Sequence, residues 1–310
     1  MIRYLARRMG HGVFVLLAVS VLVFSLSYLS GDPAVFMLPP SATPDQLDAL
    51  RVRMGFDRPV WEQYLDFLQG ILTLDFGRSF THNRDAMQLV FEFLPNTLLL
   101  VLATMVVTFL IAVPLGTLAA LKHGSFLDRL AQLLALIGQS VPPFLIGVFL
   151  ILVFTVTLRL LPAFGSPTPV GLIMPALTLG LYATAEMMRI LRSSLLDVLS
   201  EDYVRTVRAK GAGETTVVAR HAMRNAAIPV LTLMTLQVGT LVGGAVITEA
   251  VFSYPGIGML AVQAISTRDF LVVQAIVLVI ALLVVLVNIG ADVLNTLIDP
   301  RIRLAGKSHG

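Results

Sequence analysis

The sequence predicts an all-α integral membrane protein with six transmembrane helices. Of its 310 residues, 56% are hydrophobic and only 13% are charged, and the mean hydropathy is +0.86. Soluble domains carry about 25% charged residues, so this composition excludes an ordinary soluble protein. Six apolar runs are each long enough to cross roughly 30 Å of hydrocarbon. A segment in lipid must satisfy its own backbone hydrogen bonds, which makes each run a helix.

The first apolar run covers residues 13–29 and follows Arg3, Arg7 and Arg8. A basic start before an apolar run is also typical of a cleaved signal peptide. This run is longer than a signal core, and no small-residue cleavage site follows it. We therefore expect an uncleaved first transmembrane helix.

Residues 31–94 form the one sizeable polar region. The region is rich in proline and contains two amphipathic pieces, 45–54 and 60–74. We expect a small external subdomain here, so that residues 1–94 comprise the first transmembrane helix and this subdomain.

Five further spans are expected after residue 94. Pro114, Pro142, Pro143 and Pro175 fall inside these apolar runs and should bend their helices, because proline removes a backbone donor. The expected helices cover about 97–121, 131–158, 171–191, 229–251 and 271–297.

A few uncharged polar residues and glycines lie within the expected spans. Gln139, Ser140 and Gln237 are candidate pore-lining residues, although interhelical hydrogen bonding explains such side chains equally well. Gly239 and Gly243 form a GxxxG pattern, which predicts close packing of this helix on a neighbour.

Basic residues gather on one side of the expected spans. The short loops of the other side offer only Arg159 and Arg268. Because cytoplasmic loops are enriched in Lys and Arg, we expect both termini and residues 200–229 on the cytoplasmic side of the cell membrane. The basic residues of that side are Arg3, Arg7, Arg8, Lys122, Arg129, Arg189, Arg192, Arg205, Arg208, Lys210, Arg220, Arg224, Arg301, Arg303 and Lys307.

Residues 200–229 are a polar segment between two apolar runs. Ser200 is a suitable N-cap, and acidic residues follow it in the first turn. Glu201 precedes Arg205 by the four residues of a favourable ion pair. Gly211 and Gly213 then predict a turn. The first half of the segment is therefore expected to be a short helix that ends at the glycines.

A second short helix is expected from residue 214 to 227, and Pro229 opens the next apolar run. This helix carries Val217, Val218 and His221 on one side. Such a small apolar face is typical of a helix that lies in a partner's groove. A basic cytoplasmic loop without a docking role has a similar composition.

Ionisable residues within the spans are few and peripheral, namely Glu186, Glu249 and Asp292. A proton-coupled carrier is expected to hold a carboxylate or histidine relay near the midplane, so secondary transport is disfavoured. The chain has no cysteine, and no His, Asp and Glu cluster has the spacing of metal ligands. We therefore expect no catalytic residue, metal site or cofactor in this chain.

Several segments resemble the permease subunits of binding-protein-dependent ABC importers. In the polar segment, YVRTVRAKG and RHAMRNAAIP are similar to the cytoplasmic EAA loop of the dipeptide, oligopeptide, glutathione and nickel branch. Elsewhere LDFGRSF, FSYPGIGML and LIDPRIR also resemble this branch, so the resemblance covers essentially the whole chain.

The resemblance implies the type I (MetI-like) importer permease fold, with residues 95–300 as the permease core of five transmembrane helices and a coupling loop at 200–229. In that family the loop docks into a groove on the ATP-binding subunit. The residues expected to couple this chain to the ATPase are Arg205, Arg208, Gly211, Glu214, Val217, Val218 and His221.

The resemblance also implies a function and a set of partners. A permease of this branch forms half of a pathway for peptides of the dipeptide and oligopeptide class across the cytoplasmic membrane. Glutathione, nickel chelates or oligosaccharides are alternative cargoes, and a self-sufficient secondary transporter is a more distant alternative. The expected partners are a second homologous permease, two ATP-binding subunits that hold ATP and magnesium, an extracytoplasmic binding protein and membrane lipid, with no nucleic acid.

The C-terminal residues 301–310 are expected to be a basic cytoplasmic tail. Gly306, Lys307 and Ser308 imitate the end of a P-loop, but Arg301 stands where the motif requires glycine, and no strand is expected before it. The tail should therefore not bind ATP.

Overall fold

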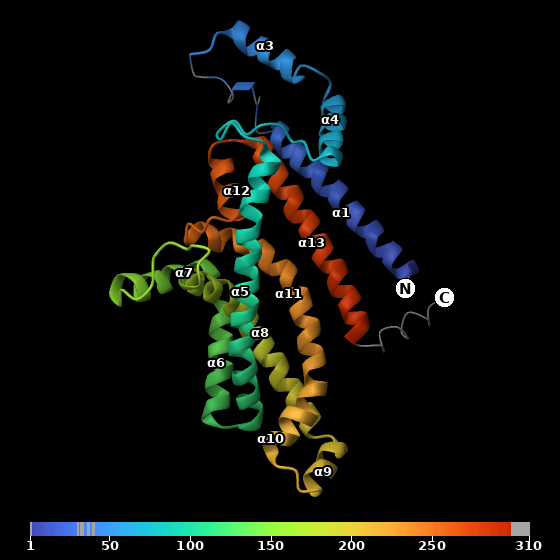
Figure 1. Cartoon of the computed structure of the whole chain (residues 1–310), viewed down its shortest axis with the longest axis vertical. Helices are drawn as coiled ribbons and strands as arrows, with labels where there is room; N and C mark the ends of the chain where they lie inside the picture. Colours follow the sequence, from blue (N-terminus) through green and yellow to red (C-terminus); the bar gives the residue numbers. More distant parts are fainter. Residues whose placement is uncertain (1, 30, 32–33, 36–37, 39–40, 299–310) are drawn as a thin grey trace. The chain divides into compact units, whose positions relative to one another are not determined.

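The computed structural model describes residues 2–29, 31, 34–35, 38 and 41–298, and within these residues the chain is helical with no strand (Figure 1). The predicted all-α class is confirmed. The predicted basic tail at 301–310 lies outside the described residues.

Five helices of the described chain are long and apolar enough to cross a membrane. A bent pair provides a sixth candidate span, in which α6 (Phe126–Ser140) is followed at 107° by α7 (Pro143–Leu150) and the π-helical turn η1 (Ile151–Thr157). The six predicted spans correspond to these five helices and the bent pair. The five helices are α1 (Ile2–Leu29), α5 (Ala86–Leu121), α8 (Pro169–Leu199), α11 (Met223–Val251) and α13 (Phe270–Ile298).

The bend predicted at Pro142 and Pro143 is confirmed and is a full break of the helix, whereas the predicted start at residue 131 is wrong, because α6 begins at Phe126. Val141, which precedes two prolines, has an extended backbone with φ −92° and ψ 127°. A residue before proline is disfavoured in the helical region, and Pro142 cannot donate the next helical hydrogen bond. The helix therefore ends at Ser140, and Pro143 starts a new one in another direction.

Three other boundaries differ from the predictions. Helix α5 begins at Ala86 rather than near 97, and α8 continues to Leu199 rather than ending near 191. Pro229 lies inside α11, so it does not open a new helix. Apolar length located the spans, but helices in this protein continue past their apolar parts.

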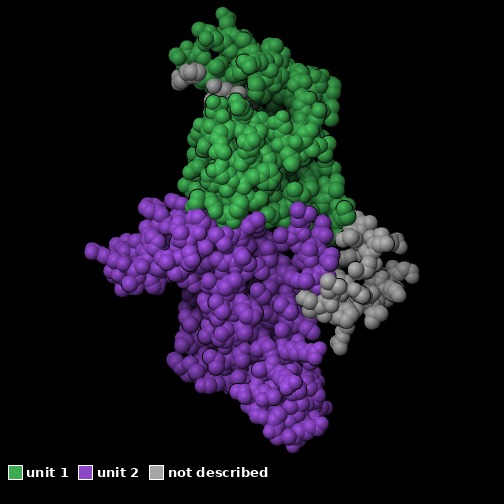
Figure 2. Space-filling model, in the orientation of Figure 1, with its two compact units in different colours: residues 1–97, 255–285 green, residues 98–254, 286–310 purple. Residues whose placement is uncertain are grey.

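The chain forms two compact units (Figure 2). The first comprises residues 1–97 and 255–285 and contains α3 (Pro44–Met54), α4 (Val60–Thr73) and α12 (Ile257–Ser266). The amphipathic pieces predicted at 45–54 and 60–74 are thus confirmed as helices. Thr43 closes a capping box with Gln46 at the start of α3, which satisfies two otherwise unpaired backbone donors.

The core of the first unit lies between the start of α5, α12 and the first half of α13. The Asn96 side chain donates to Pro255 O at 2.7 Å, and Thr97 Oγ1 accepts from Ile257 N at 2.9 Å, which ties α5 to the start of α12. Buried residues of this core include Phe76, Met87, Leu89, Val90, Ile257, Leu260, Val272 and Ile276.

The second unit comprises residues 98–254 and 286–310, and α8 packs on α6, α7 and α11 inside it. Its core is rich in alanine, which lets helix backbones approach closely. A Cβ at Gly116 would lie 2.9 Å from Met188 O, and one at Gly180 would lie 2.9 Å from Thr108 Oγ1. In contrast, a Cβ at Gly243 would meet nothing within 4 Å, so the predicted close packing is not formed at this glycine.

Candidate functional site

The coupling segment starts where α8 ends. Ser200 is the C-cap of α8, and its hydroxyl donates to Asp197 O at 2.7 Å. The prediction of Ser200 as an N-cap is therefore wrong, because α8 continues to the residue before it. Glu201 is the N-cap of α9 (Asp202–Ala209). Arg205 pairs with Asp202 at 3.4 Å rather than with Glu201.

The predicted turn at the glycines is confirmed, but only one of the two requires glycine. Gly211 has φ +83°, a conformation that side-chain-bearing residues rarely adopt. Gly213 has φ −66° and ψ 151° and is the N-cap of α10 (Glu214–Thr216). The Gly213 backbone is open to any residue type.

Two polar contacts join the halves of this hairpin. The Arg208 guanidinium donates to both carboxylate oxygens of Glu214, at 3.2 and 2.7 Å, across the turn. This hydrogen bonding raises the pKa of Arg208 above its usual value. Asn225 Nδ2 donates to the Tyr203 hydroxyl at 2.9 Å. The hairpin is thus connected at its tip and again near its base.

The second half of the hairpin is not a separate helix. α10, the π-helical turn η2 (Val217–Ala222) and α11 follow one another without a break as far as Val251. The predicted end at residue 227 is wrong, because proline at 229 removes only one backbone donor while the flanking residues stay helical.

The apolar face predicted for the second half of the hairpin is buried inside the protein. Val217 is fully buried and Val218 is 6% exposed, and η2, which carries both, packs against α9 and α8. The expectation that these two valines form an exposed docking face is therefore wrong, because they hold the hairpin together. Val204 on α9 is also fully buried, and sequence reasoning did not select it.

The exposed surface of the hairpin is polar and carries several positive charges. Ala219 is exposed, and His221 is half-buried. The exposed residues of the hairpin include Arg205, Arg208, Lys210, Glu214, Thr215, Arg220 and Arg224. Of the seven predicted coupling residues, the structure thus exposes Arg205, Arg208, Gly211 and Glu214.

The candidate pore-lining residues lie at two separate places in the second unit. Ser140 donates to Leu136 O of its own helix at 2.8 Å, and the buried Gln139 Nε2 has no hydrogen-bond partner among the described residues. Gln237 donates to the Glu186 carboxylate of α8. A cavity of about 10 Å³ lies beside Gln237, which is room for about one water molecule. The pair of Glu186 and Gln237 joins two membrane helices.

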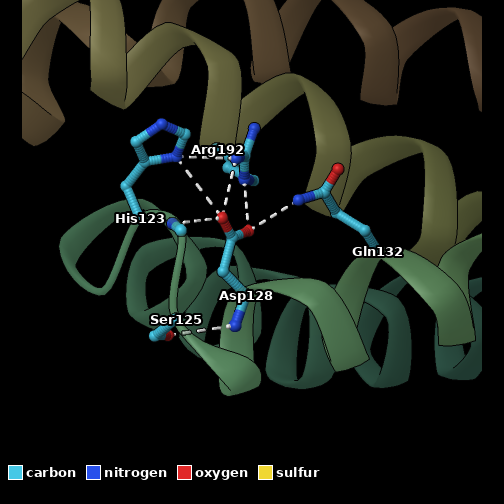
Figure 3. A network of polar contacts seen from close by, with 6 residues as sticks. His123, Ser125, Asp128, Gln132 and Arg192 are labelled. Atoms are coloured by element: carbon cyan, nitrogen blue, oxygen red, sulfur yellow. Dashed lines mark hydrogen bonds and ion pairs between the residues drawn. The ribbon is translucent and has the colours of Figure 1, made fainter.

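A buried ion pair that the sequence analysis did not identify joins α6 to α8 (Figure 3). Asp128 is 2% exposed and accepts from Arg192 Nε at 2.6 Å and from Arg192 Nη2 at 2.9 Å. Gln132 Nε2 and the Gly124 backbone also donate to this carboxylate, and His123 Nδ1 lies 3.3 Å from it. The sequence signal was weak, because an acidic residue three positions after Ser125 also suits an ordinary helix start.

No group of three or more His, Asp and Glu side chains in the described residues could hold a metal ion.

Two family models match the chain. Residues 112–304 match the binding-protein-dependent transport system inner membrane component, and residues 1–103 match the N-terminal model of the binding-protein-dependent transport system membrane component. Together these two matches cover nearly the whole sequence.

Individual relatives agree with these models. The glutathione transport system permease protein GsiC of Shigella flexneri serotype 5b (strain 8401) is 41% identical over 305 residues, which are 98% of this chain and 99% of the relative. The protein of the same name from Escherichia coli (strain K12) is 40% identical over the same shares. A chain of the inward-facing MetNI methionine ABC transporter (SeMet soak crystal form) has a TM-score of 0.59 at 21% identity and covers 69% of this chain and 97% of its own length.

Proposed function

The chain belongs to the family of binding-protein-dependent transport system inner membrane components, and from this premise we propose that it carries short peptides, with glutathione as the first substrate to test. It is a non-catalytic, multi-pass permease subunit of an ABC importer in the inner membrane, and partner subunits hydrolyse the ATP. The predicted family and the type I importer fold are confirmed.

One observation carries the choice of substrate, namely the 40% to 41% identity to glutathione permeases over nearly the whole length of both chains. The sequence analysis placed peptides first and glutathione among the alternatives. Glutathione is itself a tripeptide, so both readings share amide groups and charged chain ends. We therefore join them in one proposal, in which a tripeptide is imported by peptide-type machinery.

The proposed importer contains this chain, a second homologous permease, two ATP-binding subunits that hold ATP and magnesium, and an extracytoplasmic binding protein. The hairpin at 200–229 is proposed to lie in the cytoplasm and to contact an ATP-binding subunit through its exposed residues. Arg205, Arg208 and Glu214 belong to this exposed surface, while Val217 and Val218 support it from inside. ATP binding would then favour one of two pathway states through contacts that differ between them.

Uptake of radiolabelled glutathione into proteoliposomes that hold the complete importer tests the proposal. We expect ATP-dependent uptake that unlabelled dipeptides and tripeptides reduce, while nickel chelates and oligosaccharides leave it unchanged. Uptake of a nickel chelate or an oligosaccharide with no uptake of any peptide would overturn it.

Liposomes that contain this chain alone are the matched control. They should neither hydrolyse ATP nor accumulate peptide, because the nucleotide is proposed to bind to partner subunits. Accumulation driven by an ion gradient in these liposomes would instead support a secondary transporter.

A further inference from the structure

A cavity of about 580 Å³ lies within the first unit, outside the helices of the coupling hairpin. The last turns of α1, the segment 54–58, the helix α4, the segment 75–80 and the first turns of α13 line it. This volume lies in the range of small-ligand sites, which are mostly apolar with a few polar groups. Six phenylalanines contribute to the lining, namely Phe24, Phe56, Phe67, Phe76, Phe80 and Phe270.

A largely buried primary amide, that of Gln274, lies in this lining. Gln274 on α13 is 8% exposed and lines the cavity, and its amide makes no hydrogen bond within the part of the chain that the structure describes. Buried polar side chains in folded proteins are nearly always hydrogen-bonded. A primary amide offers two donor hydrogens and one acceptor oxygen, so it matches a ligand that carries both kinds of group. A peptide bond is such a group.

Two oppositely charged side chains, Arg58 and Asp66, also line the cavity. The Arg58 guanidinium donates to the Asp66 carboxylate, and the two side chains are 45% and 50% exposed. Gly55, with φ +72°, allows this position of Arg58, because a Cβ at residue 55 would lie 2.3 Å from Arg58 Nη2. An exposed pair of opposite charges matches the carboxylate and the ammonium group of a free peptide.

We propose that this cavity binds a short peptide with an apolar side chain. The phenylalanines contact the side chain, Gln274 hydrogen-bonds a peptide bond, and Arg58 and Asp66 bind the charged ends. A lipid acyl chain would fill the aromatic part, but it would leave both the Gln274 amide and the charged pair unused. The inference rests on the proposed function in one respect, since it takes the bound peptide to belong to the transported class.

The test is calorimetric titration of the dipeptide Leu-Phe into the purified full chain in lipid nanodiscs. Gln274→Leu keeps the size of the side chain and removes its hydrogen bonds, so the Kd should rise at least tenfold. The matched control is Gln263→Leu on the exposed side of α12, which should leave the Kd unchanged. An unchanged Kd in Gln274→Leu would overturn the proposal.

A second variant addresses the charged ends without a change in the core. Arg58→Gln combined with Asp66→Asn should weaken the binding of Leu-Phe several-fold and leave the binding of the doubly blocked N-acetyl-Leu-Phe-amide unchanged. Equal effects on both peptides would contradict the assignment of the charged pair. A phospholipid that remains in the cavity in native mass spectrometry and is not displaced by Leu-Phe would show a lipid site and overturn the proposal.

The two proposals fail in different ways. If the complete importer transports Leu-Phe but the chain in nanodiscs does not bind it, the cavity is not a peptide site and the proposed function stands. If the chain binds Leu-Phe through Gln274 but the complete importer transports no peptide, the cavity assignment stands and the proposed function fails.

Discussion

Asp128 and Arg192 form a buried ion pair that joins α6 to α8. Both side chains are largely buried, and besides the Arg192 guanidinium two groups donate to the carboxylate, the Gly124 backbone and Gln132 Nε2. His123 Nδ1 lies 3.3 Å from it. The loss of one partner leaves a buried charge without compensation, whereas the loss of both does not.

Asp128→Leu should therefore lower the stability of the folded chain by about 3–5 kcal/mol. The double variant Asp128→Leu with Arg192→Leu should recover part of this loss, since no unpaired guanidinium remains. Thermal denaturation in detergent measures both. The control is Asp48→Asn, whose 69% exposed side chain pairs with Arg51 and should change stability by about 0–1 kcal/mol. A double variant less stable than Asp128→Leu would contradict this account.

Gly211 and Gly213 form a matched pair in which only the backbone conformation differs. A Cβ at either position would meet nothing within 4 Å, but only Gly211 has a positive φ. Gly211→Ala should therefore cost about 1–2 kcal/mol in the hairpin, and Gly213→Ala should be near neutral. Limited proteolysis of the hairpin and peptide-stimulated ATPase activity of the complete importer provide the two measurements. Equal behaviour of the two variants would show that the turn does not depend on its left-handed residue.

At the scale of the element, two neighbouring residues of the hairpin lie on opposite faces, one buried inside the hairpin and one exposed to solvent. Val218 is 6% exposed, and Ala219 is exposed. Val218→Asp places a carboxylate without a partner in the interior, so we expect a loss of at least about 3 kcal/mol and less folded protein in the membrane. Detergent-extracted monodisperse chain, measured by size-exclusion chromatography, reports this loss.

Ala219→Asp should leave the amount of folded chain unchanged, because the new carboxylate faces solvent. If the exposed surface contacts an ATP-binding subunit, this same substitution should reduce transport and separate it from ATP hydrolysis. Wild-type transport and wild-type ATPase stimulation in Ala219→Asp would remove residue 219 from the proposed contact surface. The neighbouring substitution thus tests docking, while Val218→Asp tests folding.

At the scale of the whole molecule, the predicted orientation places both termini and the hairpin in the cytoplasm. The chain has no cysteine, so single-cysteine variants need no background correction. Ser41→Cys should react with a membrane-impermeant maleimide in intact spheroplasts, and Ser200→Cys should react only after permeabilisation. Both positions are exposed in the structure. The reverse pattern would contradict the orientation.

The sequence by itself determined the class of the molecule and the place of each span. Apolar runs had to be helices because lipid offers the backbone no hydrogen-bond partner, and the positions of α1, α5, α8, α11 and α13 follow from that constraint. The sequence also determined the family, because its motifs are local stretches of residues. The turn at Gly211 was likewise predictable from the residue type.

The tertiary structure alone decided which side chains face one another. Val217 and Val218 looked like a docking face because amphipathic periodicity identifies an apolar side without identifying what covers it. Their burial depends on α8 and α9. The contact between Asp128 and Arg192 also could not be predicted, because the two residues are 64 positions apart in the chain. The position of Gln274 in a cavity lined by phenylalanines likewise depends on segments that are distant in sequence. Each depends on segments distant in sequence, and periodicity within one segment contains no information about the neighbour that folding brings to it.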